Sequence, residues 1–282
     1  AAQNARKALK SGITTLRDLG GTPEIVFKFR EAVNKGFYTA PRVLTSGPAL
    51  LPTGGHGWKS GVEVDTRREI KKTVRSLIRD GSDIIKVMAS SSGPLGSEAW
   101  KRSFKKDDLM LMADEAHKMD AKITAHVTTP FAAKDCLEAG FDGLEHAGFW
   151  IDEDWTFEFV PEVAELMEEN KVNVCLTIQA SFGASRNAPG ESERKRRKKM
   201  VNDKIHSLEK LGDYDINIIA GSDAGYRYTP FGALSKGLNL MTKAGLSERE
   251  AIATATTDAA AALDLEDEIG SLEKGKKADI LV

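Results

Sequence analysis

Residues 123–148, ITAHVTTPFAAKDCLEAGFDGLEHAG, contain the pattern that decides the fold. A short apolar run, ITAHV, is followed by a helical stretch that ends at glycine and then by a second apolar run, GLEHAG. A strand, a helix and another strand in this order form one unit of a parallel sheet covered by helices. Each strand carries a histidine near its end, His126 and His146. Because strand ends converge on one face of a parallel barrel, we expect the two imidazoles to meet there.

The same alternation extends along the chain in both directions. Candidate strands lie at 13–19, 42–47, 83–89, 123–127, 143–148, 172–177 and 216–223. Helical stretches lie at 24–36, 67–81, 106–120, 130–140, 161–170, 198–213, 231–245 and 247–264. We therefore predict an α/β fold, a (β/α)8 TIM barrel, of which seven strands are visible and the first would precede Ala1.

The two ends of the chain predict how it divides into domains. Residues 1–12 have alanine and leucine at helical spacing and no initial Met, so we expect the chain to begin inside a helix. Residues 269–282 predict a turn followed by the beginning of a strand. We expect a barrel domain at 1–268 and the truncated start of a C-terminal β-sandwich at 269–282. A signal peptide would lie upstream and stays open.

Charge and composition limit the function classes. Forty basic and forty-two acidic residues give a net charge of −2, which argues against a nucleic-acid or membrane-surface role. No apolar run approaches the length of a membrane-spanning helix. Cys136 and Cys175 are isolated and form neither a metal motif nor a disulfide framework. We expect a cytoplasmic protein that acts on a small molecule, with a homo-oligomeric state left open.

Two longer connections interrupt the alternation. Residues 50–61, LLPTGGHGWKSG, are glycine-rich and carry His56 after the second candidate strand. Residues 181–200 follow the sixth strand and are expected to form a loop that contains the basic run RKRRKK. This run leads directly into a predicted helix, so we interpret it as a solvated helix face rather than a nucleic-acid site.

Two more strands end close to residues that can hold a metal. IIKVMAS places Lys86 inside an apolar strand, where burial of an ammonium is costly and lowers its pKa. NIIAGSDAG ends at Asp223, between two glycines. One Lys, two His and one Asp on separate strands point to metal-assisted hydrolysis, since imidazole suits Zn²⁺ well. Each residue also has a structural alternative: a Lys paired with a carboxylate, a core or surface His, and an Asp that caps a helix.

With these motifs in place, the chain resembles the amidohydrolase superfamily, and within it the imidazolonepropionase-like and prolidase-like (Xaa-Pro dipeptidase-like) metal-dependent hydrolases. The motifs that carry the resemblance occur in the family's order along nearly the whole chain: NARKALKSGITTLRDLG, TSGPALLPTGGHG, IIKVMAS, AHVTT, LEHAG, GSDAG and GSLEKGKKADILV. The resemblance implies a barrel accompanied by a β-sandwich and one or two divalent metal ions, by preference zinc. It also implies a His-x-His pair at the end of the first barrel strand, and the sequence contains no such pair.

The resemblance also implies roles for the metal-site residues. Lys86, carboxylated by CO2, would bridge two cations, and His126 and His146 would hold the second of them. Asp223 would bind the first metal and take the proton from the attacking water.

Other residues are candidates for contacts with the substrate. His56 would polarise the substrate carbonyl or hold a substrate carboxylate, although a loop histidine without a role is an equal alternative. Tyr226, Arg227 and Tyr228 would contact a substrate carboxylate or simply be exposed. Glu145, next to His146, is expected to point away from the barrel interior because strand side chains alternate.

The predicted reaction is hydrolysis of an amide bond by metal-activated water. The substrate class that the resemblance implies is a dipeptide with a C-terminal Pro or other residue, or an N-acyl amino acid. One alternative is a cyclic amide of the imidazolone type. Another is a catalytically incomplete barrel fragment that lacks the His-x-His ligands.

Overall fold

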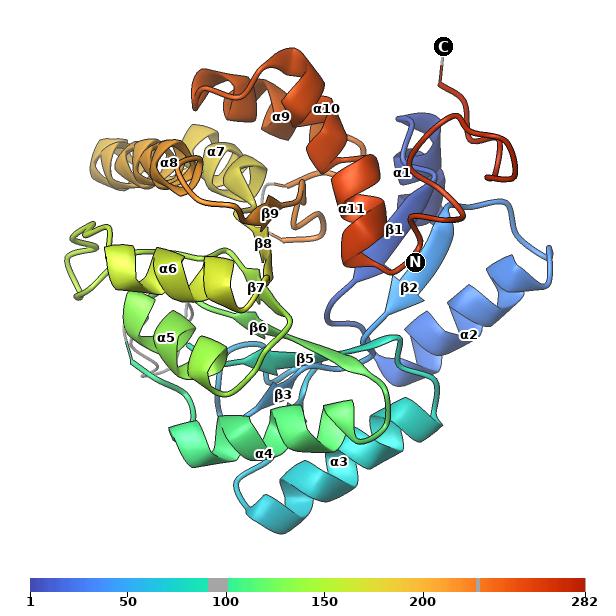
Figure 1. Cartoon of the computed structure of the whole chain (residues 1–282), viewed down its shortest axis with the longest axis horizontal. Coiled ribbons are helices and arrows are strands. Elements are labelled where there is room, and N and C mark those ends of the chain that lie inside the picture. The colour runs from blue at the N-terminus through green and yellow to red at the C-terminus, as the bar shows by residue number, and fades with distance from the viewer. Residues whose placement is uncertain (91–100, 227–228, 282) are drawn as a thin grey trace.

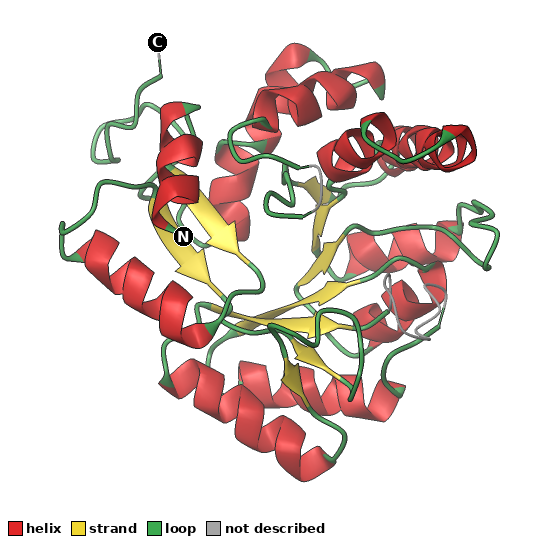
Figure 2. Ribbon diagram, turned by 180° about the vertical axis from the view of Figure 1, so that it is seen from behind, coloured by secondary structure: helices red, strands yellow, loops and turns green. Residues whose placement is uncertain are grey.

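Parallel strands surround a central axis and helices form the outer layer of the molecule (Figure 1). The structure is a computed structural model that describes residues 1–90, 101–226 and 229–281. The view from behind shows the same ring of strands with its helical coat (Figure 2). Two of the predicted substrate contacts, Arg227 and Tyr228, lie outside the described residues.

All seven predicted strands are present; β6 has its predicted length, shifted by one residue, and the others are shorter than predicted. The strands are β1 (Thr15–Asp18), β2 (Arg42–Thr45), β3 (Leu50–Leu51), β4 (Val62–Glu63), β5 (Ile84–Met88), β6 (Lys122–His126), β7 (Gly143–Glu145), β8 (Asn173–Cys175) and β9 (Asn217–Ile218). One sheet has the order β4-β3-β5-β6-β7-β8-β9, a second joins β1 to β2, and every pairing is parallel. The parallel α/β barrel architecture is thus confirmed, while two short strands were not predicted: β3 lies within the predicted loop 50–61 and β4 follows it directly.

The two sheets follow one another around the ring. The backbone N–H of Asp83, at the start of β5, donates to the carbonyl of Thr45 at the end of β2 (2.9 Å). Among the described residues, β1 pairs only with β2 and β9 only with β8, so the ring is open between β9 and β1. Helical residues lie against β9 at this opening: the side chain of Asn217 donates to the carbonyl of Asp258 (3.3 Å).

The helices follow the predicted alternation closely. They are α1 (Ala2–Lys10), α2 (Pro23–Asn34), α3 (Arg67–Arg79), α4 (Lys106–His117), α5 (Pro130–Glu138), α6 (Pro161–Glu169), α7 (Ile178–Arg186), α8 (Glu191–Leu211), α9 (Leu234–Lys243), α10 (Glu248–Thr254) and α11 (Thr257–Ala262). Local signals explain several boundaries. Thr66 and Glu69 form a capping box at the start of α3, and the Thr129 hydroxyl caps α5 by accepting from Ala132 N.

The loop predicted at 181–200 is wrong, because α7 and most of the first half of α8 occupy it. Two interactions favour helix there. Ile178 and Ala184 bury apolar surface, and Glu193 forms ion pairs with the arginines three and four residues later, Arg196 (2.8 Å) and Arg197 (2.6 Å). The basic run therefore lies on a helix, as predicted, and this helix begins about two turns earlier than expected.

The hydrophobic core fills the space between the strands and the helical layer. Ile85, Val87, Ile123 and Leu144 are fully buried there. The alternate strand positions face the centre of the ring, since side chains alternate along a strand. The register aligns Met88 with His126 and His126 with Glu145, which brings the ends of β5, β6 and β7 level.

The C-terminal segment differs from its prediction. The structure shows no strand between residues 269 and 281, where the beginning of one was expected. The segment is tied to the barrel by an ion pair between Asp279 and Arg42 on β2. The division into a barrel at 1–268 and a sandwich segment at 269–282 stays a prediction. In the part of the chain that the structure describes, no helix is long and apolar enough to cross a bilayer.

Candidate functional site

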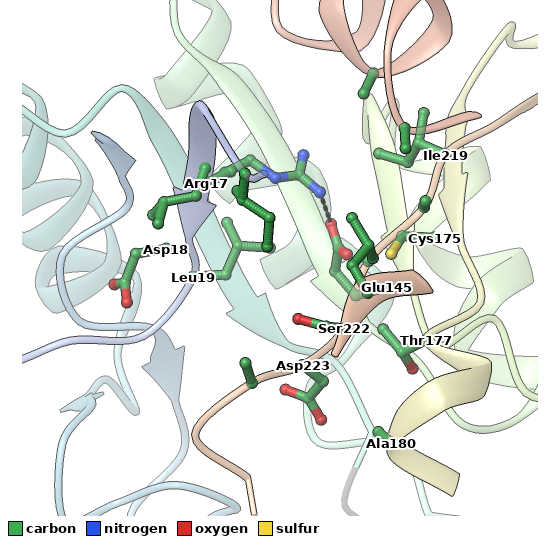
Figure 3. A pocket seen from close by; sticks show the side chains of 18 of the residues that line it. Arg17, Asp18, Leu19, Glu145, Cys175, Thr177, Ala180, Ile219, Ser222 and Asp223 are labelled. Carbon is green, nitrogen blue, oxygen red and sulfur yellow. Dashed lines mark hydrogen bonds and ion pairs between the residues drawn. The ribbon is translucent and has the colours of Figure 1, made fainter. Parts of the chain in front are cut away.

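A cavity of about 1300 Å³ lies at the carboxyl ends of the central strands. Figure 3 shows part of its wall, with Asp223 pointing into the space between the strand ends. The predicted site residues that the structure describes all line this cavity: His56, Lys86, His126, His146, Asp223 and Tyr226. The sequence patterns therefore converge on one site. In (β/α)8 barrels this face carries the active site.

Three histidines cluster at the centre of the cavity. His126 ends β6 and His146 follows β7, and their ring centroids are 4.3 Å apart. His56, from the connection between β3 and β4, lies 5.0 Å from His126 by the same measure. In the sequence, His126 and His146 are 20 residues apart, and His56 and His126 are 70 residues apart. The fold of the barrel brings the three rings together.

The backbone is left-handed at three of the strand ends. His146 has φ +71°, Thr177 φ +48° and Asp223 φ +51°. Such values are uncommon outside glycine and cluster at functional sites. At His146 this conformation interrupts the strand alternation, so His146 and its neighbour Glu145 both line the cavity.

The expectation that Glu145 points away from the barrel interior is therefore wrong. Its carboxylate pairs with Arg17 on β1 (2.6 Å), an interaction drawn in Figure 3, and accepts a hydrogen bond from Thr124 on β6 (2.9 Å). Arg17 and Glu145 are both largely buried. The pair joins the two sides of the cavity floor, and Arg17, too, is a lining residue that the sequence alone did not bring into the site.

Burial perturbs the charged groups of the site. Desolvation lowers the pKa of Lys86 to about 8, although the nearby Glu145 and Asp223 carboxylates oppose this effect. Desolvation raises the pKa of Asp223 to about 6, against the influence of Lys86 and Lys204. The Lys86 amine therefore loses its proton more readily than a solvated lysine, and the Asp223 carboxyl group titrates nearer to neutral pH. Such perturbed groups in one cavity are typical of catalytic sites.

The imidazoles of His126 and His146 are held neutral. Burial, followed by the nearby positive charges, lowers the pKa of each well below its usual value. His126 Nε2 is buried and has no hydrogen-bond partner among the described atoms, so a lone pair or an N–H faces the cavity unsatisfied. An unsatisfied buried nitrogen is costly, and a cation or a ligand that contacts it would remove the cost.

These donors fit a divalent cation in part. Neutral imidazole is a preferred ligand of zinc and similar metals. Within residues 1–90, 101–226 and 229–281, however, no three His, Cys, Asp or Glu side chains lie close enough to hold a metal by themselves. His126 and His146 supply two donors, and Lys86 and Asp223, which line the same cavity, are the other groups of the predicted metal site that could complete them.

A hydrogen-bonded chain that the sequence did not predict supports His146 from behind. Its Nδ1 lies 2.7 Å from Thr177 Oγ1, and Lys204 Nζ donates to the same hydroxyl (3.1 Å) and to the Leu176 carbonyl. Lys204 is buried on α8 together with Leu208 and Leu211. A lysine within the apolar stripe of a predicted helix was the signal that could have revealed it.

Known proteins resemble this chain over nearly its whole length. The model of the Amidohydrolase family matches residues 1–282. Ochratoxinase from Aspergillus niger is 27% identical over 318 residues, which cover 99% of this chain and 62% of the relative. The chain thus spans about three fifths of the length of these curated relatives.

Solved structures of similar proteins share the fold. A Xaa-Pro dipeptidase with methionine bound in its active site is 26% identical with a TM-score of 0.82, covering 98% of this chain and 70% of that one. A putative prolidase from Bifidobacterium longum is 26% identical with a TM-score of 0.83, covering 98% and 68%. The crystal structure of A. niger ochratoxinase is 25% identical with a TM-score of 0.82, covering 98% and 67%.

Proposed function

This chain belongs to the amidohydrolase family, and from that premise we propose that it takes part in hydrolysing an amide bond in a dipeptide or an N-acyl amino acid. One observation carries the proposal: Lys86, His126, His146 and Asp223, from four strands, line a single cavity. The similar proteins support the substrate class, because they include a Xaa-Pro dipeptidase, a putative prolidase and ochratoxinase. The amide hydrolysis and the substrate class are both proposals for the whole protein, since this chain spans 62% of the length of ochratoxinase.

We assign the metal-binding role to His126, His146 and Lys86, with zinc as the preferred ion. A divalent metal, when bound, supplies a water of lowered pKa and polarises the carbonyl of the substrate. The two imidazoles are already neutral, as ligands must be. Lys86, with a pKa of about 8, has a usable fraction of free amine near neutral pH. That amine adds to CO2 through a new N–C bond, loses one proton, and yields a carbamate with two oxygen donors.

Asp223 is the proposed general base. With a pKa of about 6 it is mostly ionised at pH 7 and can accept the proton of the water that attacks the carbonyl carbon. The same proton then passes from Asp223 to the nitrogen that leaves. This pKa is higher than that of a solvated carboxyl group and closer to the operating pH. It therefore suits a group that must both accept and return a proton.

His56 is the proposed partner of the substrate carboxylate. Burial, followed by the charge of Lys86, lowers its pKa, which favours the neutral ring. It stands 5.0 Å from His126, on the side of the cavity formed by the connection between β3 and β4. A carboxylate held there would lie within one amino-acid residue of the reacting carbonyl.

The test is hydrolysis of a defined panel by the zinc-loaded protein. The panel contains Xaa-Pro dipeptides, N-acyl amino acids and an imidazolone-type cyclic amide, each tried with the wild-type protein and with Asp223→Asn. We expect turnover of acyclic amides that end in a carboxylate, and a loss of at least about 100-fold in kcat in the variant. Absence of turnover by folded, metal-loaded protein would favour the alternative that the barrel alone is catalytically incomplete. Turnover of the cyclic amide alone would replace the proposed substrate class.

A further inference from the structure

One face of α8 lines the cavity over about two turns. Basic side chains lie at both ends of this face. Lys204, Met200, Arg197 and Arg196 all contribute to the lining. Their spacing of three, four and seven or eight residues places them on the same side of a helix. Lys204 marks the inner end of this face, because its ammonium reaches Thr177 beside His146.

The outer end of this face has an excess of positive charge. Arg196 binds Glu193 with two hydrogen bonds (2.9 and 2.8 Å) and Arg197 donates to the same carboxylate (2.6 Å). Two guanidinium groups therefore share one negative charge. Both arginine side chains are partly exposed to solvent, so an anion in the cavity can approach the donors that Glu193 does not use.

Aromatic rings accompany these arginines. The Arg196 guanidinium lies over the ring of Trp155, 5.4 Å from its centroid, and Trp155 makes an edge contact with Trp150 at 5.3 Å. Tyr226 forms a side-chain hydrogen bond with Arg197. Lys199 on α8 donates to the Trp155 carbonyl (2.9 Å), which ties the tryptophan to the helix. We call Trp155, Arg196, Arg197 and Tyr226 the outer subsite.

The outer subsite is too far from the reacting centre to bind the carboxylate of the amino acid that leaves. Seven or eight residues of helix separate its arginines from Lys204, which corresponds to about 10–12 Å along the axis. In an N-acyl amino acid the carboxylate carbon is three bonds from the reacting carbonyl carbon, under about 4 Å. The residues of the outer subsite also come from the connections that follow β7, β8 and β9, whereas His56 comes from the connection between β3 and β4. The acyl half of the substrate would therefore extend towards the arginines.

We propose that the outer subsite binds a planar acyl group with a negative charge at its far end, namely an aromatic ring that carries a carboxylate or a phenolate. This inference rests on the proposed amide hydrolysis and specifies its substrate. A guanidinium pairs with a carboxylate through two parallel N–H groups, and it also stacks on aromatic rings. Trp155 and Arg196 supply such a stacking surface, and Arg197 supplies the charge-assisted donors next to it.

The experiment compares two substrates that differ only in that charge. N-(4-carboxybenzoyl)-L-leucine and N-(4-carbamoylbenzoyl)-L-leucine have the same shape, but only the first has an anionic ring substituent. Both are assayed with zinc-loaded wild-type protein, with Arg196→Gln/Arg197→Gln, and with Arg194→Gln/Lys195→Gln. The last variant is the matched control, because it removes the same charge from exposed positions of the same helix that do not line the cavity.

We expect the wild-type protein to prefer the carboxylate by about tenfold or more in kcat/KM, equivalent to about 1.4 kcal/mol. The preference should disappear in Arg196→Gln/Arg197→Gln, mainly through KM, and should persist in the control. Equal kcat/KM for the two substrates in the wild type, or an unchanged preference in Arg196→Gln/Arg197→Gln, would overturn the inference.

A binding measurement separates this inference from the proposed reaction. Quenching of tryptophan fluorescence by the same two compounds reports on Trp155 and Trp150 whether or not the amide is cleaved. Tighter binding of the carboxylate that depends on Arg196 and Arg197, without any turnover, would uphold the subsite and refute the proposed hydrolysis. Turnover of both compounds at equal kcat/KM would uphold the proposed hydrolysis and refute the subsite.

Discussion

His146 Nδ1 lies 2.7 Å from Thr177 Oγ1, and the hydroxyl accepts a further hydrogen bond from Lys204. The orientation of the imidazole is thus set by a residue that follows β8 and by a lysine on α8. When Nδ1–H donates to this hydroxyl, the lone pair of Nε2 is left for a cation, which is the usual arrangement of histidines that ligate metals. The contact therefore links the helical layer to the proposed chemistry.

Thr177→Val should impair metal binding and catalysis without unfolding the barrel. The substitution keeps the shape of the side chain but removes the hydroxyl that His146 and Lys204 both contact. We expect zinc affinity to fall about 10–100-fold, the range found when a group that orients a metal ligand is lost. Competition with a chelator measures the affinity. Thr177→Ser restores the hydroxyl and should recover most of it; equal defects in Val and Ser variants would contradict the role of the hydroxyl.

Lys204→Met should change how stability depends on pH. The pKa of Lys204 is about 8 in the folded protein because burial disfavours the charge, against 10.5 for a solvated lysine. Between these values the unfolded state binds more protons than the folded state, so the free energy of unfolding rises with pH. In Lys204→Met the part of this increase that comes from Lys204 should be absent. At 1.36 kcal/mol per pKa unit it amounts to up to about 3 kcal/mol.

Urea denaturation at pH 7 and at pH 10 measures this effect. Lys198→Met is the control, since Lys198 is exposed on the same helix. A Lys204→Met variant whose stability rises with pH as steeply as that of the control would show that Lys204 keeps its ordinary pKa in the fold.

Arg17→Met should strongly destabilise the barrel. It leaves the Glu145 carboxylate, which is 5% exposed, buried without its ion-pair partner. We expect the free energy of unfolding to fall by about 3–5 kcal/mol, and a double variant Arg17→Met/Glu145→Leu to recover much of the loss. The exposed pair of Arg79 and Asp80 is the comparison, because solvent screens this ion pair and Arg79→Met should cost far less stability than Arg17→Met. Similar losses for both single variants would contradict the importance of burial.

Asp223→Asn should separate catalysis from stability. The pKa of Asp223 is raised to about 6 by burial, so between pH 4 and pH 6 the folded state binds more protons than the unfolded state. The wild-type free energy of unfolding should therefore fall as pH rises through this window, and the variant should lack that fall. At neutral pH we expect a variant at least as stable as the wild type but without the proposed activity. An inactive variant that is also unfolded would indicate a structural role instead.

His126→Ala and His146→Ala should each reduce the zinc bound per chain, measured by plasma mass spectrometry after dialysis. The two rings are the donors that we assign to the metal, and His126 Nε2 has no hydrogen-bond partner among the described atoms. His206→Ala is the control, because His206 is exposed on α8 and pairs with Glu209. Full zinc content in both site variants would place the metal elsewhere.

The periodic signals of the sequence predicted the architecture well. Apolar runs followed by helices ending at glycine located every main strand, and the same strands brought His126, His146, Lys86 and Asp223 to one cavity. The failures have a common physical cause. Strand alternation placed Glu145 outside, but the left-handed backbone of His146 is a property of the folded turn and leaves no mark on periodicity.

Helix α7 and the first half of α8 were missed for a different reason. Residues 181–200 are rich in Ser, Gly, Arg and Lys, and this composition is shared by solvated loops. The deciding contributions were the burial of Ile178 and the ion pairs of Glu193 with Arg196 and Arg197. The two arginines of the outer subsite lie in this same region, so their place in the cavity could not be predicted from the sequence pattern.

The left-handed conformations at His146, Thr177 and Asp223 limit how this protein can be engineered. Each one costs about 1–3 kcal/mol relative to a relaxed backbone, and the cost is highest for a β-branched residue such as Thr177. A selection for heat resistance would therefore favour glycine or asparagine at these positions. Every such gain would remove an imidazole, a hydroxyl or a carboxylate from the cavity. Thermostable descendants of this barrel should consequently acquire their stabilising substitutions in the helical layer and leave the strand ends strained.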